Sequence, residues 1–156
     1  MKSPAMTVPG LMDAMQGLGK AASQAASAAG VPRAVMDLVA LRASQINGCA
    51  VCLDMHTRGA KKAGETDERL FTLAAWRDSP YFTDAERAVL ALTEAGTRLA
   101  DQPGAVPDDV FQAAARHFDE RALAAVVAAI TAINAWNRLN VISGQVAGEW
   151  TAQWAN

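Results

Sequence analysis

The twenty residues from Asp37 to His56 read DLVALRASQINGCAVCLDMH, and the rest of the chain can be interpreted around them. They contain both cysteines of the protein, Cys49 and Cys52, and one of its two histidines. If residues 49–56 form a helix, each residue turns by about 100°, so the two cysteines and the histidine share an arc of about 60°. Two thiols and an imidazole on one helix face suit a redox site or a metal site.

The residues just before the cysteines predict where this helix begins. Asn47-Gly48 is a turn signal and a common helix start. Both cysteines would then lie in the first turn, where free backbone N–H groups and the helix dipole favour a thiolate over a thiol. The dipole favours Cys49, which is nearest the helix start. Cys52, by contrast, lies one turn from His56, and a protonated imidazole there would stabilise the Cys52 thiolate.

Composition limits the classes of function. The 156 residues, 51% of them hydrophobic, fit one globular domain. The net charge is −2, from 14 basic and 16 acidic residues, and there is no basic block, so we expect no nucleic-acid partner. The N-terminus has no apolar signal segment, which predicts a cytoplasmic protein. The apolar run 122–136 contains Thr131 and Asn134 and is short for a membrane span, so we expect a buried helix there.

The spacing of apolar residues predicts an all-α fold of roughly seven helices, because no segment alternates with the period of a strand. Thr83-Asp84-Ala85-Glu86 is a capping box, the strongest local helix signal. Residues 1–9 carry no periodic signal and are expected to form a flexible or partner-dependent arm. The predicted helices cover about residues 11–29, 32–46, 49–63, 66–76, 84–99, 107–114 and 119–141.

Several interpretations of the chemical residues stay open at this point. Free cysteines are often inert core residues, His56 could lie on the surface, and Asp37 could be a solvated helix charge. A metal-binding or redox-sensing protein could instead use Cys49, Cys52 and His56 as zinc ligands, with Asp37 as a fourth. A third interpretation is that the fold serves mainly as an assembly module.

The run from Leu38 to His56 resembles the core of the AhpD-like, carboxymuconolactone decarboxylase family. In that family an acid is followed by eleven residues, C-x-x-C, three residues and a histidine. Asp37, Cys49, Cys52 and His56 occupy these positions. The similarity extends over residues 64–66, 73–77 (LAAWR) and 133–139 (INAWNRL), and so covers about residues 30–140.

The resemblance implies a single AhpD-like domain over residues 1–156, with its core at 30–140 and an N-terminal arm or helix at 1–29. It implies a homo-oligomer, often a trimer or hexamer, that reduces hydroperoxides and is recycled by an unidentified thiol or disulfide reductant. It implies no metal or organic cofactor. It also implies that Cys52 attacks the peroxide, that Cys49 resolves the product as a disulfide, and that the acid and the histidine relay protons.

Two departures from the family pattern bear on activity. The acid is usually glutamate, and Asp37 is one methylene shorter. The alkylhydroperoxidases carry histidine between the cysteines, where this chain has Val51. Both changes alter the proton relay and predict a low peroxidase activity. The decarboxylase members lack the redox pair, so the resemblance disfavours decarboxylation here.

Overall fold

The computed structural model describes residues 1–102 and 104–149. Within them it contains eight α-helices, one 3-10 helix and no strand, which confirms the all-α prediction. Residues 103 and 150–156, which the single-domain prediction also covers, lie outside the described residues. The elements are α1 (Pro4–Thr7), α2 (Leu11–Ala28), α3 (Arg33–Asn47), α4 (Ala50–Lys62), α5 (Asp67–Thr72), η1 (Leu73–Asp78), α6 (Asp84–Thr97), α7 (Asp108–Ala115) and α8 (Glu120–Ile142).

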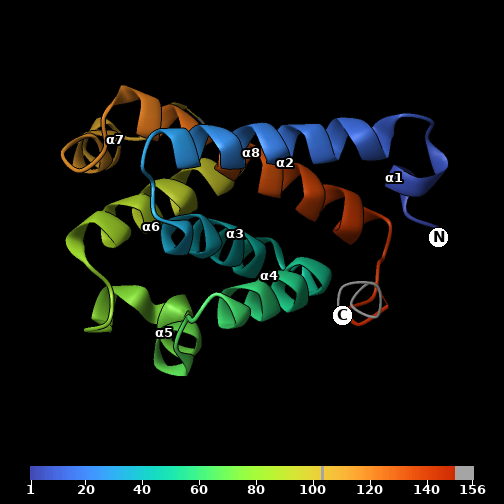
Figure 1. Cartoon of the computed structure of the whole chain (residues 1–156), viewed down its shortest axis with the longest axis horizontal. Coiled ribbons are helices and arrows are strands. Elements are labelled where there is room, and N and C mark those ends of the chain that lie inside the picture. The colour runs from blue at the N-terminus through green and yellow to red at the C-terminus, as the bar shows by residue number, and fades with distance from the viewer. Residues whose placement is uncertain (103, 150–156) are drawn as a thin grey trace.

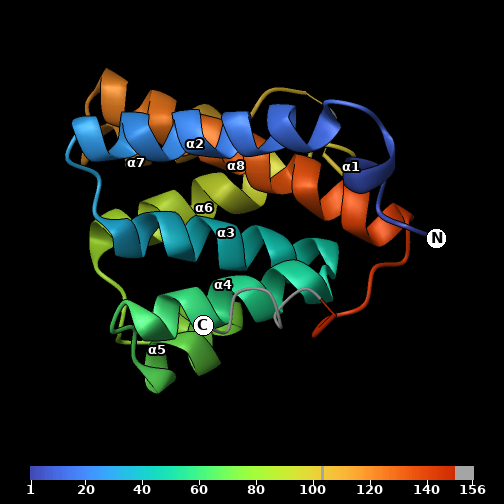
Figure 2. The same cartoon turned by 45° about the vertical axis from the view of Figure 1, so that its right-hand side comes forward.

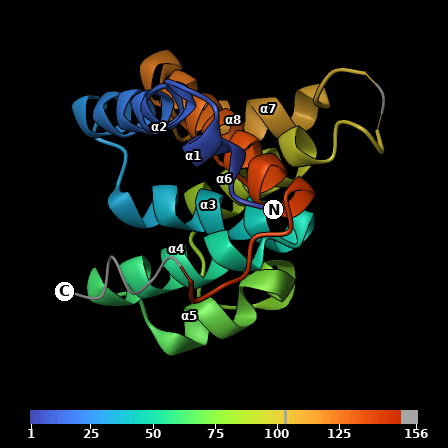
Figure 3. The ribbon, with the colours of Figure 1, turned by 90° about the vertical axis from the view of Figure 1, so that its right-hand side faces the viewer.

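The helices stack in three layers with α3 in the middle one (Figure 1). Helix α2 lies along α8 in the upper layer, α3 and α6 form the middle layer, and α4 and α5 lie below (Figure 2). The view along the long axis shows the same order, with the N-terminus beside the end of α8 (Figure 3). Helix α3 packs against α8, α6 and α4, so it connects the layers.

Helix α3 is buried on two sides, because its apolar residues supply two hydrophobic clusters. The larger cluster joins it to α6 and α8 and includes both cysteines. The smaller cluster joins it to α4, η1 and α6. In the larger cluster α3 contributes Val35, Val39, Ala40 and Ala43. In the smaller cluster it contributes Leu38 and Leu41, which pack with Ala60, Leu73, Trp76, Phe82 and Leu90.

A buried carboxylate also fixes α3 to its neighbours. Glu94 of α6 accepts hydrogen bonds from Arg42 Nε and from Trp76 Nε1, each at 2.8 Å. Arg77 Nη2 lies 2.8 Å from the other Glu94 oxygen. A buried charge is tolerated where it is paired and hydrogen-bonded, as it is here. Glu94 therefore holds α3, η1 and α6 together.

The helix caps confirm the local signals in the sequence. The Thr83 N–H donates to Glu86 Oε2 at 2.8 Å, and the Glu86 N–H donates to Thr83 Oγ1 at 3.3 Å, so the predicted capping box is formed. Asp119 Oδ1 accepts from the N–H of Ala122 at 2.9 Å and caps α8. These side chains satisfy N–H groups that a helix start leaves free.

Two sequence predictions about the fold were wrong. Residues 1–9 are not a free arm, because they contain α1, bury Ala5, and place the terminal amino group 3.4 Å from the carbonyl oxygen of Ser143. Helix α6 ends at Thr97, which leaves Leu99 beyond it and about half exposed. The contact of the N-terminus joins residues that are 142 positions apart, so no local signal in the sequence indicates it.

Helix α8 combines length with apolar composition. Among the described residues it is the one helix that could cross a membrane by these two measures, a property shared with core helices. Half of its most apolar window is buried inside the fold. It packs against α2 and α3, as the predicted buried helix should. The Ala-rich α2, whose weak apolar face needs a neighbour, rests on this helix (Figure 1).

Candidate active site

The two cysteines lie at the junction of α3 and α4. Gly48 follows α3 with φ +66°, a left-handed conformation that glycine adopts without strain, and so reverses the chain. Cys49 is then the N-cap of α4, and its Sγ accepts a hydrogen bond from the backbone N–H of Cys52 at 3.4 Å. The predicted helix start is confirmed. Both thiols are free and buried, with exposed fractions of 1% and 2%.

The junction makes the two thiols unequal. A hydrogen bond from the Cys52 thiol, supported by the Cys52 backbone N–H, outweighs burial and lowers the pKa of Cys49 to about 6. The same hydrogen bond, together with burial, raises the pKa of Cys52. The contacts at this junction therefore favour a thiolate at Cys49 and a neutral thiol at Cys52. This agrees with the argument from the helix dipole, which favours Cys49 as the activated thiol. It does not agree with the expectation that Cys52 is the activated thiol.

His56 lies one turn after Cys52 on α4 and is partly buried. Burial lowers the pKa of His56, the charge of Asp37 partly offsets this, and the charge of Arg33 adds to the lowering. Within the described residues no hydrogen bond joins His56 to either sulfur. The imidazolium that was expected to stabilise Cys52 is therefore disfavoured at neutral pH.

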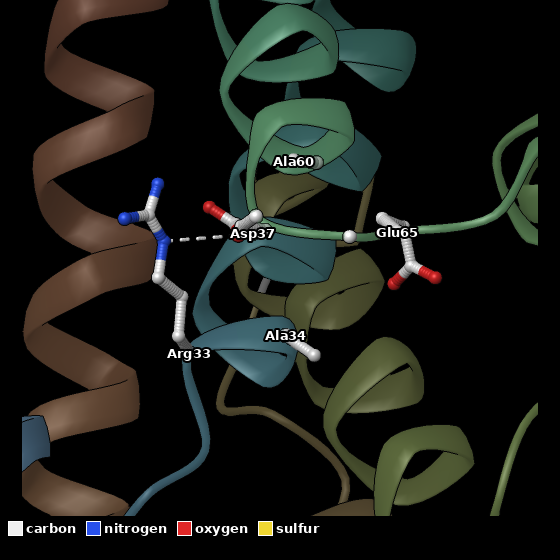
Figure 4. Close-up of a pocket in the computed structure, with 7 residues that line it drawn as sticks. Arg33, Ala34, Asp37, Ala60 and Glu65 are labelled. Carbon is white, nitrogen blue, oxygen red and sulfur yellow. Dashed lines mark hydrogen bonds and ion pairs between the residues drawn. The ribbon is translucent and has the colours of Figure 1, made fainter.

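Asp37 faces α4 from the first half of α3. It accepts a hydrogen bond from Arg33 Nε at 3.3 Å, and its side chain is 14% exposed, so it is not a freely solvated charge. Both residues line a cavity of about 210 Å³. Figure 4 shows the Arg33 side chain reaching toward Asp37, with Ala60 of α4 close to Asp37. The cavity is lined by Arg33, Ala34, Asp37, Ala60, Ala63, Gly64 and Glu65. The structure thus brings Asp37 within electrostatic reach of His56 but gives it no bond to the thiols.

The metal-site alternative lacks its ligand geometry. Across residues 1–102 and 104–149, no three side chains among His, Cys, Asp and Glu are arranged to hold a metal ion. The Cys52 sulfur instead meets the side-chain nitrogen of Asn140, on α8, at 3.4 Å. Asn140 was not among the residues that the sequence analysis singled out.

Asn140 is the last of three buried asparagines on α8, which we name the asparagine ladder: Asn134, Asn137 and Asn140. The first two bind other helices. Asn137 Nδ2 donates to Ser44 Oγ at 3.0 Å, and Asn134 Nδ2 donates to Thr97 Oγ1 at 3.1 Å. Asparagines three residues apart share one face of a helix. In an otherwise apolar helix, this spacing is the sequence signal that could have indicated a row of buried, hydrogen-bonded asparagines.

Comparison with known proteins agrees with this architecture. A model of the carboxymuconolactone decarboxylase family matches residues 9–95. The uncharacterized protein YdfG of Bacillus subtilis (strain 168) is 38% identical over 114 residues, which are 73% of this chain and 76% of that protein. The uncharacterized protein YnjA of Escherichia coli (strain K12) is 36% identical over 107 residues, 68% of this chain and 57% of YnjA.

Solved structures show the same fold. An Agrobacterium tumefaciens protein of unknown function, provisionally described as the antioxidant defence protein AhpD, superposes with a TM-score of 0.81 at 33% identity, covering 92% of this chain and 94% of its own. The debrominase Bmp8, solved with 2,3,4-tribromopyrrole, superposes with a TM-score of 0.77 over 92% of this chain and 73% of its own. Its 22% identity supports the fold alone. With the family model matching more than half of its length, the chain belongs to the carboxymuconolactone decarboxylase family.

Proposed function

We propose that this protein is a thiol-dependent oxidoreductase that reduces hydroperoxides through Cys49 and Cys52. The observation that carries the proposal is the Cys49 sulfur at the start of α4, where it accepts the Cys52 N–H and lies next to a second free thiol. A thiolate is the nucleophilic form of cysteine, and a neighbouring thiol can convert its oxidised product to a disulfide. The similarity to the Agrobacterium protein supports this assignment.

The reaction has two steps. The Cys49 thiolate attacks one peroxide oxygen, so an S–O bond forms and the O–O bond breaks. The leaving alkoxide, or hydroxide when the substrate is hydrogen peroxide, takes a proton to become an alcohol or water. Cys52 then loses its proton and attacks the Cys49 sulfenic acid. The S–S bond forms, the S–OH bond breaks, and the hydroxide leaves as water with that proton. Two thiols supply the two electrons, and an external thiol or dithiol reductant restores them.

We assign His56 and Asp37 to proton transfer. His56 lies one turn from Cys52, and its pKa responds to the charge of Asp37. A neutral imidazole can pass a proton through its two nitrogens, so it can deliver the proton that the leaving oxygen takes. Asp37 would act on this step through His56, since no described hydrogen bond connects it to sulfur.

Thiol titration tests the proposal directly. Reduced protein should show two titratable thiols per chain, and a small excess of hydrogen peroxide should remove both together. Intact mass should then fall by two hydrogens, as an intramolecular disulfide requires. Cys49→Ser and Cys52→Ser proteins should not form that disulfide. Persistence of both thiols after peroxide treatment, in protein of unchanged helix content, would rule the function out.

We also propose that the protein is a homo-oligomer. The end of α8 and the segment after it expose large apolar side chains, Val141, Ile142 and Val146, of which Ile142 is 84% exposed. Such clusters are costly in water unless another surface covers them. A second copy of the chain is the partner that this family resemblance favours.

A further inference from the structure

The asparagine ladder ends at a sulfur atom rather than at another polar group. Asn134 and Asn137 use their side-chain nitrogens to donate to hydroxyl groups of α6 and α3. Asn140 is about as buried as Asn134, at 7% against 8% exposure. Its side-chain nitrogen donates to Cys52 Sγ at 3.4 Å. Burying an amide is costly unless its hydrogen bonds are made. A neutral thiol is a weak acceptor, whereas a thiolate is a strong one, so this contact is best satisfied when charge is on sulfur.

The surrounding network holds Asn140 in this position. Asn47, at the end of α3, donates to the side-chain oxygens of both Asn134 and Asn137 at 2.9 Å. Asn137 in turn donates to Ser44, one turn earlier on α3. The bonds of Asn137 to Asn47 and Ser44 fix the rotation of α8 against α3 here, and Asn140, one turn later, therefore faces the junction where α4 begins. The donor reaches Cys52 from a different helix, so it does not depend on the cap geometry of α4.

The contact also orients the Cys52 proton. The Cys52 sulfur accepts from Asn140, so the Cys52 thiol can direct its own hydrogen toward Cys49. The hydrogen bond from the Cys52 thiol is the interaction that most strongly lowers the pKa of Cys49. We propose that Asn140 is a further catalytic residue: it orients the Cys52 thiol toward Cys49 in the reduced protein and stabilises the negative charge on Cys52 during disulfide formation. Its second role rests on the proposed peroxidase function, but its first does not.

Loss of the donor should be visible in the reduced protein without any substrate. Asn140→Leu keeps the approximate volume and removes the amide. The ultraviolet absorbance of the thiolate is followed against pH, and the pKa of the first thiol to ionise should rise by about one pH unit. This is the size expected when a thiolate loses one hydrogen bond, here the one that the oriented Cys52 thiol donates to Cys49. Asn140→Asp keeps the shape, cannot donate as a carboxylate and repels a thiolate, so it should raise that pKa further. It serves as the test if the leucine variant does not fold.

Asn134→Leu is the matched control. It removes the same side chain from the same helix at similar burial, but Asn134 does not touch sulfur. This variant should lose thermal stability while its thiol titration stays at the wild-type position. An equal pKa shift in Asn134→Leu would show that loosened packing, not the donor to sulfur, causes the effect. An unchanged titration in both Asn140 variants would overturn the proposal.

The second role is tested with one equivalent of hydrogen peroxide and dimedone, which traps sulfenic acid. In Asn140→Leu the resolving step should slow, so the share of protein trapped as the dimedone adduct should rise several-fold over wild type, while Asn134→Leu stays at the wild-type share. Equal trapping in wild type and Asn140→Leu would remove this role and leave the thiol titration to decide the first. If peroxide oxidises neither the wild type nor any variant, the proposed peroxidase function is wrong. The thiol titration still tests whether Asn140 orients the thiol pair.

Discussion

The backbone N–H of Cys52 donates a hydrogen bond to the Sγ of Cys49 at 3.4 Å, so one cysteine caps the helix that carries the other. An N-cap side chain normally offers oxygen to this N–H. Here a sulfur takes that place, and the preference of the helix start for negative charge becomes a preference for a thiolate. This relationship separates the two thiols chemically although only two residues lie between them.

The stability of the reduced protein should depend on pH in a way that reports this pairing. The pKa of Cys49 is lowered from 9.0 to about 6 in the fold, while the pKa of Cys52 is raised. Between pH 6 and pH 9 the unfolded chain holds both thiol protons and the folded protein holds one, so stability rises with pH. Above pH 9 the unfolded chain loses both protons and stability falls again.

Denaturant midpoints of the reduced protein across this range provide the measurement. Cys49→Ser is the control, because it removes the thiolate and should show no rise between pH 6 and pH 9 beyond that of the other ionisable groups. Parallel curves for wild type and Cys49→Ser would mean that the two thiols are not coupled.

Asp37→Asn should slow peroxide-driven oxidation by on the order of ten-fold, less than the ~10²–10⁴ attributed to a direct general acid or base, because Asp37 acts through His56. Asp54→Asn is the matched control. Asp54 forms the same kind of i,i+4 pair, with Arg58 at 2.7 Å, and is similarly shielded at 21% exposure. Single-turnover rates of thiol loss give the comparison. Equal slowing in both variants would show that Asp37 affects the rate only as a general charge on the protein, and not through His56.

His56→Gln should slow oxidation by at least ~10-fold and leave the first thiol pKa where it is. The reason is that burial lowers the pKa of His56, so there is little imidazolium at neutral pH for the thiolate to lose. Thiolate absorbance against pH, measured beside the oxidation rate, separates the two effects. If the first thiol pKa instead rises toward 9.0 in this variant, a charged His56 stabilises the thiolate in the unchanged protein. That result would support Cys52 as the activated thiol.

Light scattering at micromolar concentration should give a mass of at least two chains. Ile142→Asp should shift the population toward the monomer, because it places a charge in the exposed apolar cluster at the end of α8. Phe71→Asp provides a control at another strongly exposed apolar residue, on α5. A monodisperse monomer for the unchanged protein would contradict the oligomer.

Local signals in the sequence predicted the helices well, because caps and apolar spacing act within a few residues. Thr83 with Glu86, and Asp119 with Ala122, form as their spacing indicates. The turn at Gly48 also placed the cysteines correctly at a helix start. Distant contacts were not predictable in this way, and α1 packing beside Ser143 is one example.

The candidate site shows the same division. Spacing placed Cys52 and His56 one turn apart on α4, but it could not show that burial would lower the pKa of His56. Nor could it show that the neighbour of Cys52 would be Asn140, which is 88 residues away in the chain. Which thiol is activated depends on these tertiary contacts, and they favour Cys49, whereas the spacing to His56 and the family pattern led to the expectation that Cys52 attacks.

The central claim, that Cys49 is the thiolate which attacks peroxide, is tested most directly by dimedone trapping in the two single-cysteine variants. Cys52→Ser keeps the N–H to Cys49 and offers a hydroxyl in place of the thiol, so it should react with one equivalent of peroxide and carry the dimedone adduct on Cys49. Cys49→Ser should react slowly. An adduct on Cys52 in Cys49→Ser, formed at a rate near that of wild type, would contradict the account.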